Sequence, residues 1–116
     1  MKLVQFGAGN IGRSFIGQIF SRAGWSVVFV DVNKKLVDLL NERKYYNVVI
    51  KQQDKLDEIH RIGPVRAIHS ENKTVIAEEL ATADLVSTSV GKAALHAIIP
   101  LLARGLEARY HYHPDW

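Results

Sequence analysis

Three glycines within the first twelve residues constrain the fold of this chain more than any other feature. They occur in Gly7-Ala8-Gly9-Asn10-Ile11-Gly12, directly after the apolar run 3–6. In a strand-to-helix turn each glycine has its own role: Gly7 permits the turn, Gly9 lets a pyrophosphate approach the backbone, and Gly12 lets the helix pack on the strand. Free N–H groups at the start of such a helix, aided by its dipole, favour a phosphate.

The residues around the glycines fit a strand-helix-strand unit. Residues 2–6 have the length and apolar content of a short buried strand. A set of apolar residues then repeats at helical spacing and predicts one packed helix face: Ile11, Phe15, Ile16, Ile19, Phe20 and Ala23. Gly24 is placed to end that helix. The run 27–30 is continuously β-branched or aromatic, which is typical of a parallel strand buried on both faces.

Asp31 completes the pattern of a dinucleotide site. It follows the second predicted strand, 24 positions beyond Gly7, close to the ~20-residue separation at which a carboxylate accepts hydrogen bonds from the adenosine ribose. A carboxylate there repels the 2′-phosphate of NADP, so we expect NAD. The alternatives are that Asp31 is only a turn former, with Asn33 capping the next helix, and that Lys34 or Lys35 reaches a 2′-phosphate.

The rest of the chain alternates strands with helices. The pattern predicts a helix over 34–43 with Leu36, Val37, Leu39 and Leu40 facing inward, then a small antiparallel excursion over 45–50 and 58–62 and a break at Gly63-Pro64. A third core strand over 65–68 is followed by a helix over 74–83 that is capped by Asn72 or Thr74. A fourth strand over 84–90 leads into a helix from Lys92 that is kinked or restarted at Pro100.

This order predicts an α/β, doubly wound parallel sheet, the Rossmann NAD(P)-binding fold, with core strand order 3-2-1-4. The fold is incomplete, because a fifth and a sixth strand are absent, and we expect 1–116 to be a truncated N-terminal dinucleotide-binding domain. Ligands of such sheets lie beyond the carboxyl ends of the strands, where the order reverses. That rule places Thr88, Ser89, Val90 and Gly91 beside the glycine loop, with Val90 and Gly91 as coenzyme contacts.

Composition narrows the function classes. Hydrophobic residues make up 47% of the 116 residues and the formal charge is +3, with no basic run that would call for nucleic acid. There is no cysteine, which excludes disulfides and cysteine-based zinc sites. The early glycines interrupt any signal-peptide pattern, and no apolar run reaches the length of a membrane span. We therefore expect no membrane partner and a cytoplasmic location.

Several segments resemble the mannitol dehydrogenase family, in particular its bacterial mannitol-1-phosphate 5-dehydrogenases. The segments are Phe6-Gly7-Ala8-Gly9-Asn10-Ile11-Gly12-Arg13-Ser14-Phe15-Ile16-Gly17, Asp31-Val32-Asn33, Ser87-Thr88-Ser89-Val90-Gly91, Ile99-Pro100 and Gly105-Leu106. The resemblance runs nearly end to end. It implies an NAD-dependent oxidoreductase that acts on a CH–OH group and interconverts mannitol 1-phosphate and fructose 6-phosphate.

On the family pattern the coenzyme segment is 3–14. With the residues argued above, the candidate cofactor-binding set is Leu3, Val4, Gln5, Phe6, Gly7, Ala8, Gly9, Asn10, Ile11, Gly12, Arg13, Ser14, Asp31, Val90 and Gly91. The family's catalytic lysine, asparagine and histidine lie in a helical C-terminal domain, which no stretch here matches. We therefore expect no catalytic residue in this chain, no activity from it alone, and a polyol or sugar phosphate held by the missing domain. The tail 109–116 departs from the family.

Arg13 and the histidines each have more than one candidate role. A cation at a helix start opposes the helix dipole, so Arg13 is either near a pyrophosphate or substrate phosphate or in a surface salt bridge. His60, His69 and His96 are better explained as packed or surface residues than as a general acid or base. His111 and His113 alternate as two metal ligands would, but a third ligand is absent and we expect no metal site.

Two other functions share many of these features. A regulatory nucleotide-sensing module of a channel or transporter has a similar glycine loop and acidic residue without chemistry of its own. A sugar-acid reductase of the same family, of the tagaturonate type, shares much of this half. Asn10, Ile11, Gly12 and Arg13, with the Pro100 region, favour the polyol-phosphate enzyme over the sensing module.

Overall fold

A computed structural model describes residues 1–112 and 114–115. The elements in chain order are β1 (Lys2–Phe6), the π-helix η1 (Gly12–Gly17), α1 (Gln18–Arg22), β2 (Ser26–Asp31), α2 (Lys34–Arg43), β3 (Tyr46–Ile50), β4 (Glu58–Ile62), β5 (Val65–His69), α3 (Lys73–Ala81), β6 (Leu85–Thr88) and α4 (Lys92–Tyr112). Every strand and helix that the sequence predicts is present within a few residues of its expected bounds.

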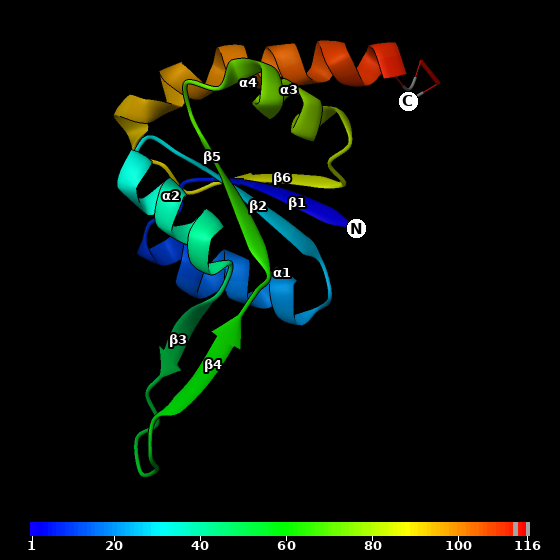
Figure 1. The fold of residues 1–116 in the computed structure, drawn as a ribbon. Coiled ribbons are helices and arrows are strands. Elements are labelled where there is room, and N and C mark those ends of the chain that lie inside the picture. Colours follow the sequence, from blue (N-terminus) through cyan, green and yellow to red (C-terminus); the bar gives the residue numbers. More distant parts are fainter. Residues whose placement is uncertain (113, 116) are drawn as a thin grey trace.

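Four strands form one parallel sheet in the order β5-β2-β1-β6. This is the predicted order 3-2-1-4 of the core strands. The crossovers place η1, α1 and α2 on one face and α3 and α4 on the other (Figure 1). Phe6, the last residue of β1, pairs with Val30 of β2 and Thr88 of β6. The carboxyl ends of these three strands therefore meet at one edge.

Each face of the sheet packs its own apolar core. Under α3 and α4 the buried residues are Val4, Phe6, Val28, Val30, Ile68, Ile76, Leu80, Ala83, Ile98 and Leu101. Under η1, α1 and α2 they are Leu3, Ala8, Val27, Phe29, Val37, Leu40, Val65 and Ala67. Alternate residues of β1 and β2 point into opposite cores, which explains why β2 is apolar throughout 27–30 and why Gln5 is the one polar residue within 3–6 of β1.

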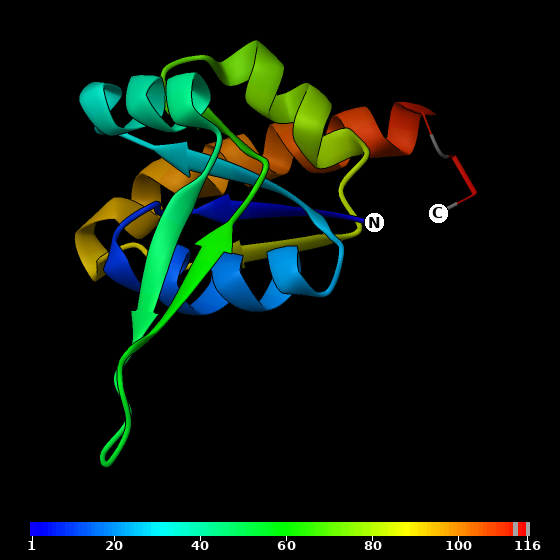
Figure 2. The ribbon, with the colours of Figure 1, turned by 60° about the horizontal axis from the view of Figure 1, so that its bottom comes forward.

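The excursion between the second and third core strands is an antiparallel hairpin, as predicted. β3 and β4 form a separate two-stranded sheet that projects away from the layered body (Figure 2). Val48 and Ile62 are buried at its base, whereas Val49 and Ile59 pair across the strands and stay exposed. The ring of Tyr46 packs edge-on against Phe29 of β2, with centroids 6.2 Å apart, and joins the hairpin to the sheet.

The helix after the glycine loop differs from its prediction. Ile16 and Phe20 pack on the core, but Ile11, Phe15 and Ile19 are 63%, 59% and 49% exposed. The six apolar positions span more than one helix face. Successive helical residues point about 100° apart, so Phe15 and Ile19, which each precede a packed residue, point away from the core. The expected end of the helix is correct, since Gly24 has φ +88°.

Three further helix expectations differ from the structure. In α2, Val37 and Leu40 are buried and Leu36 packs on the core, but Leu39 is 40% exposed and does not face inward. α4 continues through Pro100 rather than restarting there. A proline removes one backbone donor, which a helix of 21 residues tolerates. Asn72 occupies the N-cap position of α3, but its side chain makes no cap hydrogen bond.

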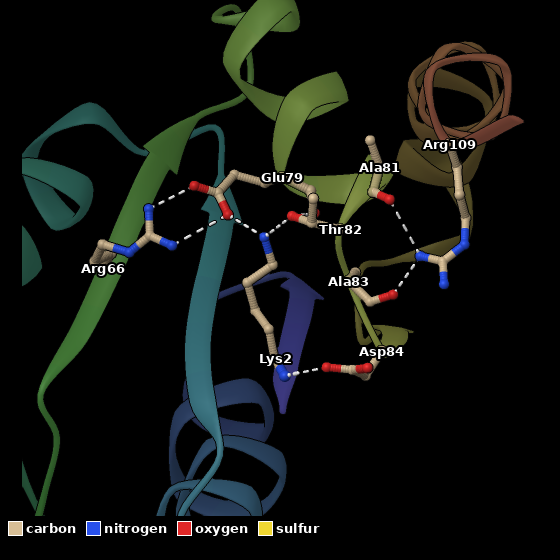
Figure 3. Close-up of polar contacts among 8 residues, drawn as sticks. All are labelled: Lys2, Arg66, Glu79, Ala81, Thr82, Ala83, Asp84 and Arg109. Carbon is tan, nitrogen blue, oxygen red and sulfur yellow. Dashed lines mark hydrogen bonds and ion pairs between the residues drawn. The ribbon is translucent and has the colours of Figure 1, made fainter. Parts of the chain in front are cut away.

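A polar network joins the amino ends of the strands to α3 and α4 (Figure 3). Lys2 Nζ lies 2.6 Å from Glu79 Oε2, and Arg66 donates to both oxygens of the same carboxylate at 2.5 and 3.1 Å. The Lys2 backbone N–H donates to Asp84 at 2.7 Å, and Arg109 of α4 donates to the Ala83 carbonyl at 2.5 Å. Glu79 thus links β1, β5 and α3.

Acid is expected to weaken this link. Hydrogen bonds from Arg66 hold the pKa of the Glu79 carboxyl below its usual 4.5, with Lys2 acting in the same direction and burial opposing both. A carboxyl with a lowered folded-state pKa stabilises the fold above its unfolded pKa, and that stability is lost as the pH falls through the folded value.

We therefore expect Glu79→Gln to lower the free energy of unfolding by about 1 kcal/mol at about pH 7, a modest loss because Arg66 is exposed to solvent. The difference from the unsubstituted protein should shrink below about pH 4. Urea unfolding at both pH values measures it. Glu78→Gln on the exposed face of the same helix is the control. If the free energies of unfolding of the Glu79 variant and the unsubstituted protein differed by the same amount at both pH values, the stabilising role of the Glu79 carboxylate would be contradicted.

Candidate functional site

A cavity of about 560 Å³ opens at the carboxyl edge of the sheet, on the side of α3 and α4. Gly7, Asp31, Val90 and Gly91 all line it, together with Phe6. These residues come from the ends of β1, β2 and β6. The structure therefore brings the first glycine, the acidic residue and the end of the fourth core strand to one place, as the strand order predicts.

The glycine loop is tightly folded above β1. Gly7 has φ +100°, and its N–H donates to the Val30 carbonyl at 2.8 Å. A Cβ on Gly12 would run into the Gly7 carbonyl oxygen, so the start of η1 can approach the turn only without a side chain. A Cβ on Gly9 would meet nothing within 4 Å. The backbone of Gly9 is thus open to a ligand.

Asp31 forms a turn with Asn33, and Asn33 caps the next helix, as the alternative to a ribose contact had it. Asp31 Oδ2 accepts from the Ala8 N–H at 2.8 Å, and Oδ1 accepts from the Asn33 N–H at 2.8 Å. Asn33 Oδ1 accepts from the Leu36 N–H at 3.1 Å and caps α2. Asp31 therefore ties the glycine loop to the end of β2 and places its carboxylate at the cavity.

Gln5 supports the loop from below. Its side chain is fully buried, and Nε2 lies 2.9 Å from Ser89 Oγ, 3.1 Å from the Phe6 carbonyl and 3.3 Å from the Gly7 carbonyl. Leu3 and Val4 are fully buried within the sheet. The contribution of this part of the segment is to hold the loop in place.

The remaining candidates lie along η1. Ser14 Oγ donates to Asn10 Oδ1 at 2.9 Å, and Ile11 is exposed. Arg13 lies apart from the cavity at the sheet edge: its N–H donates to the Gly9 carbonyl, whereas its side chain lines a different cavity beside α2 and the hairpin. Tyr46 donates to the Arg13 carbonyl at 2.7 Å. Its burial raises the pKa of the phenol, with a smaller opposing effect of Arg13.

Several cavity residues were not predicted. They are Val30, Val32, Ser70, Glu71, Lys73, Ala94, Ala97, Ile98, Pro100 and Leu101. Ser70, Glu71 and Lys73 follow the carboxyl end of β5, next to β2, so the strand order contained a signal for them. The contribution of the small residues of α4 could not be predicted, because it depends on how α4 packs over the carboxyl edge of the sheet.

Other expectations concern metals and membranes. Within 1–112 and 114–115, no group of three or more potential ligand side chains gathers to hold a metal. His111 belongs to α4, and His113 lies outside the described residues. No helix in the described part of the chain is long and apolar enough to cross a membrane.

The fold and the glycine loop define a Rossmann domain, and the comparisons give its family. The family model "Mannitol dehydrogenase Rossmann domain" matches residues 1–114, so the chain belongs to the mannitol dehydrogenase family. It is 47% identical over 113 residues to a mannitol-1-phosphate 5-dehydrogenase of Brevibacillus brevis, and 45% identical over 114 residues to one of Geobacillus thermodenitrificans. In both cases 97% of this chain is covered, and the chain spans 29% of the relative's length.

Proposed function

We propose that this chain is the coenzyme-binding domain of an NAD-dependent polyol-phosphate dehydrogenase that interconverts mannitol 1-phosphate and fructose 6-phosphate. The observation that carries the coenzyme site is the meeting of Gly7, Asp31 and Gly91 at one cavity on the carboxyl edge of the sheet. The identity of the relatives as mannitol-1-phosphate 5-dehydrogenases supports the substrate. The same identity favours an enzyme over a nucleotide-sensing module.

The residues present fit the coenzyme. Gly9 has no side chain, and the space that a Cβ would occupy there is empty, so a pyrophosphate can approach the backbone just before the helix begins. The Asp31 carboxylate suits the hydroxyls of the adenosine ribose. Val90 and Gly91 line the side toward β6, where the nicotinamide half would lie. When bound, the coenzyme accepts or supplies the hydride.

Asp31 is expected to set the preference for NADH over NADPH. We expect Asp31→Asn to raise the dissociation constant of NADH about tenfold, because the charged acceptor for the ribose hydroxyls is lost and because the amide has only one oxygen for the Ala8 and Asn33 N–H groups. The amide no longer repels a 2′-phosphate, so the preference over NADPH should narrow. Isothermal titration calorimetry with both coenzymes measures this. The control is Asp38→Asn, on the exposed face of α2. Comparable affinities of the unsubstituted protein for NADH and NADPH would contradict the proposal.

We also infer that the catalytic groups and the substrate site belong to the part of the relatives that this chain does not cover. The purified chain is then expected to bind NADH without reducing fructose 6-phosphate. Hydride transfer by the chain alone would overturn this division. Since sugar phosphates are charged and do not cross a bilayer unaided, the proposed activity belongs in the cytoplasm.

A further inference from the structure

A second cavity, of about 590 Å³, lies between η1, the second half of α2 and the base of the hairpin. Its lining includes Arg13, Arg43, Tyr45, Tyr46, Asn47 and Arg61. It shares no lining residue with the cavity at the sheet edge. Its helices, η1 and α2, pack on the sheet face opposite α3 and α4. The proposed coenzyme site does not account for it.

The charge of this cavity is one-sided. Three arginines line it, and no acidic residue does. The ion pairs found among the described residues involve none of Arg13, Arg43 and Arg61. The buried Nε of Arg13 also has no hydrogen-bond partner in that part of the chain. Three like charges around one hollow repel one another, so an anion bound between them would be favoured.

The surrounding groups hold the cations in place. The guanidinium carbon of Arg61 lies 3.9 Å from the centre of the Tyr45 ring, a cation–π contact that leaves the N–H edges of Arg61 free to donate. The Arg13 backbone is fixed by the hydrogen bond from Tyr46. The cationic groups therefore come from three separate elements, η1, α2 and β4, whose positions the fold sets.

We propose that this cavity binds the phosphate group of a small phosphate ester, at a site separate from the coenzyme. Guanidinium groups match the oxygens of a phosphate in geometry and charge. The cavity falls within the range of about 300–1,000 Å³ that organic ligands occupy, which is more than a lone phosphate needs. Tyr45 and Asn47 offer an aromatic surface and an amide for the organic part of the ester.

Calorimetric titration with glucose 6-phosphate, at low ionic strength and about pH 7.5, tests the proposal. We expect binding of the ester with a dissociation constant of about 1 mM or tighter, and none of glucose. Arg43→Gln and Arg61→Gln should each weaken it about tenfold, because each removes a charge-assisted hydrogen bond. Arg104→Gln on the exposed face of α4 removes the same charge elsewhere and should have little effect. Circular dichroism checks that each variant is folded.

Three results would overturn the proposal: no binding of glucose 6-phosphate, unchanged affinity in both the Arg43 and Arg61 variants, or tighter binding of inorganic phosphate than of the ester. Saturating NADH should leave the ester's dissociation constant within about twofold. Competition between the two ligands would place the phosphate in the coenzyme cavity and contradict a separate site. Titration with NADH in the absence of the ester tests the proposed coenzyme site alone. The coenzyme site and the phosphate-ester site can therefore be refuted independently.

Discussion

Gly12→Ala is expected to lower the free energy of unfolding by about 3 kcal/mol, the upper part of the usual range for overpacking a buried site. The added Cβ would run into the carbonyl oxygen of Gly7, a backbone atom. That atom cannot rotate away as a side chain would, because its peptide group is held by two hydrogen bonds: the Ala8 N–H donates to Asp31 Oδ2 at 2.8 Å, and Gln5 Nε2 donates to the Gly7 carbonyl at 3.3 Å. The start of η1 would have to move off β1.

Urea unfolding followed by circular dichroism measures the Gly12→Ala effect, and Gly91→Ala is the matched control. A Cβ on Gly91 would meet no atom within 4 Å, and no positive φ favours glycine there. We expect that control to unfold like the unsubstituted protein. Equal stability of the Gly12 and Gly91 variants would show that the close approach of the glycine loop to η1 is not a requirement of the fold.

Gly9→Ala is expected to separate coenzyme binding from stability. A Cβ at Gly9 contacts nothing within 4 Å, so the free energy of unfolding should change by less than about 1 kcal/mol. The same methyl group would stand where the pyrophosphate approaches the backbone. We expect the dissociation constant of NADH to rise about a hundredfold, which corresponds to about 2.8 kcal/mol.

Calorimetric titration with NADH, beside urea unfolding of the same sample, measures both quantities for the Gly9 variant. Gly24→Ala is unsuitable as a control because Gly24 has φ +88°, so Ala23→Gly, next to it and remote from the cavity, serves instead. Gly9→Ala with unchanged NADH affinity would place the pyrophosphate elsewhere.

The sheet could be predicted because its signals are local and agree with one another. The continuous apolar run 27–30 marked the central strand β2, and glycines marked the turns at Gly7 and Gly24, both of which have positive φ. Once the strands were placed, the strand order followed from the handedness of the crossovers. The meeting of Asp31 and Gly91 at one edge then needed no further information.

What the sequence did not reveal depends on contacts between distant segments. The π-helical turn at η1 lies where the Tyr46 hydroxyl bonds the Arg13 carbonyl, 33 positions apart in the chain. The exposure of Ile11 and Phe15 depends on which part of a wide apolar stripe faces the sheet. The grouping of Arg13 with Arg43 and Arg61 requires the base of the hairpin to lie beside the end of α2. Periodicity contains none of these relations.

The most direct test of the coenzyme site is an NMR titration of backbone amides with NADH. The amides of Gly7 to Gly12, Asp31, Val90 and Gly91 are expected to shift together and to saturate at one dissociation constant, while those of the β3–β4 hairpin stay unchanged. Absence of shifts at the glycine loop, or shifts confined to α2 and the hairpin, would contradict the account.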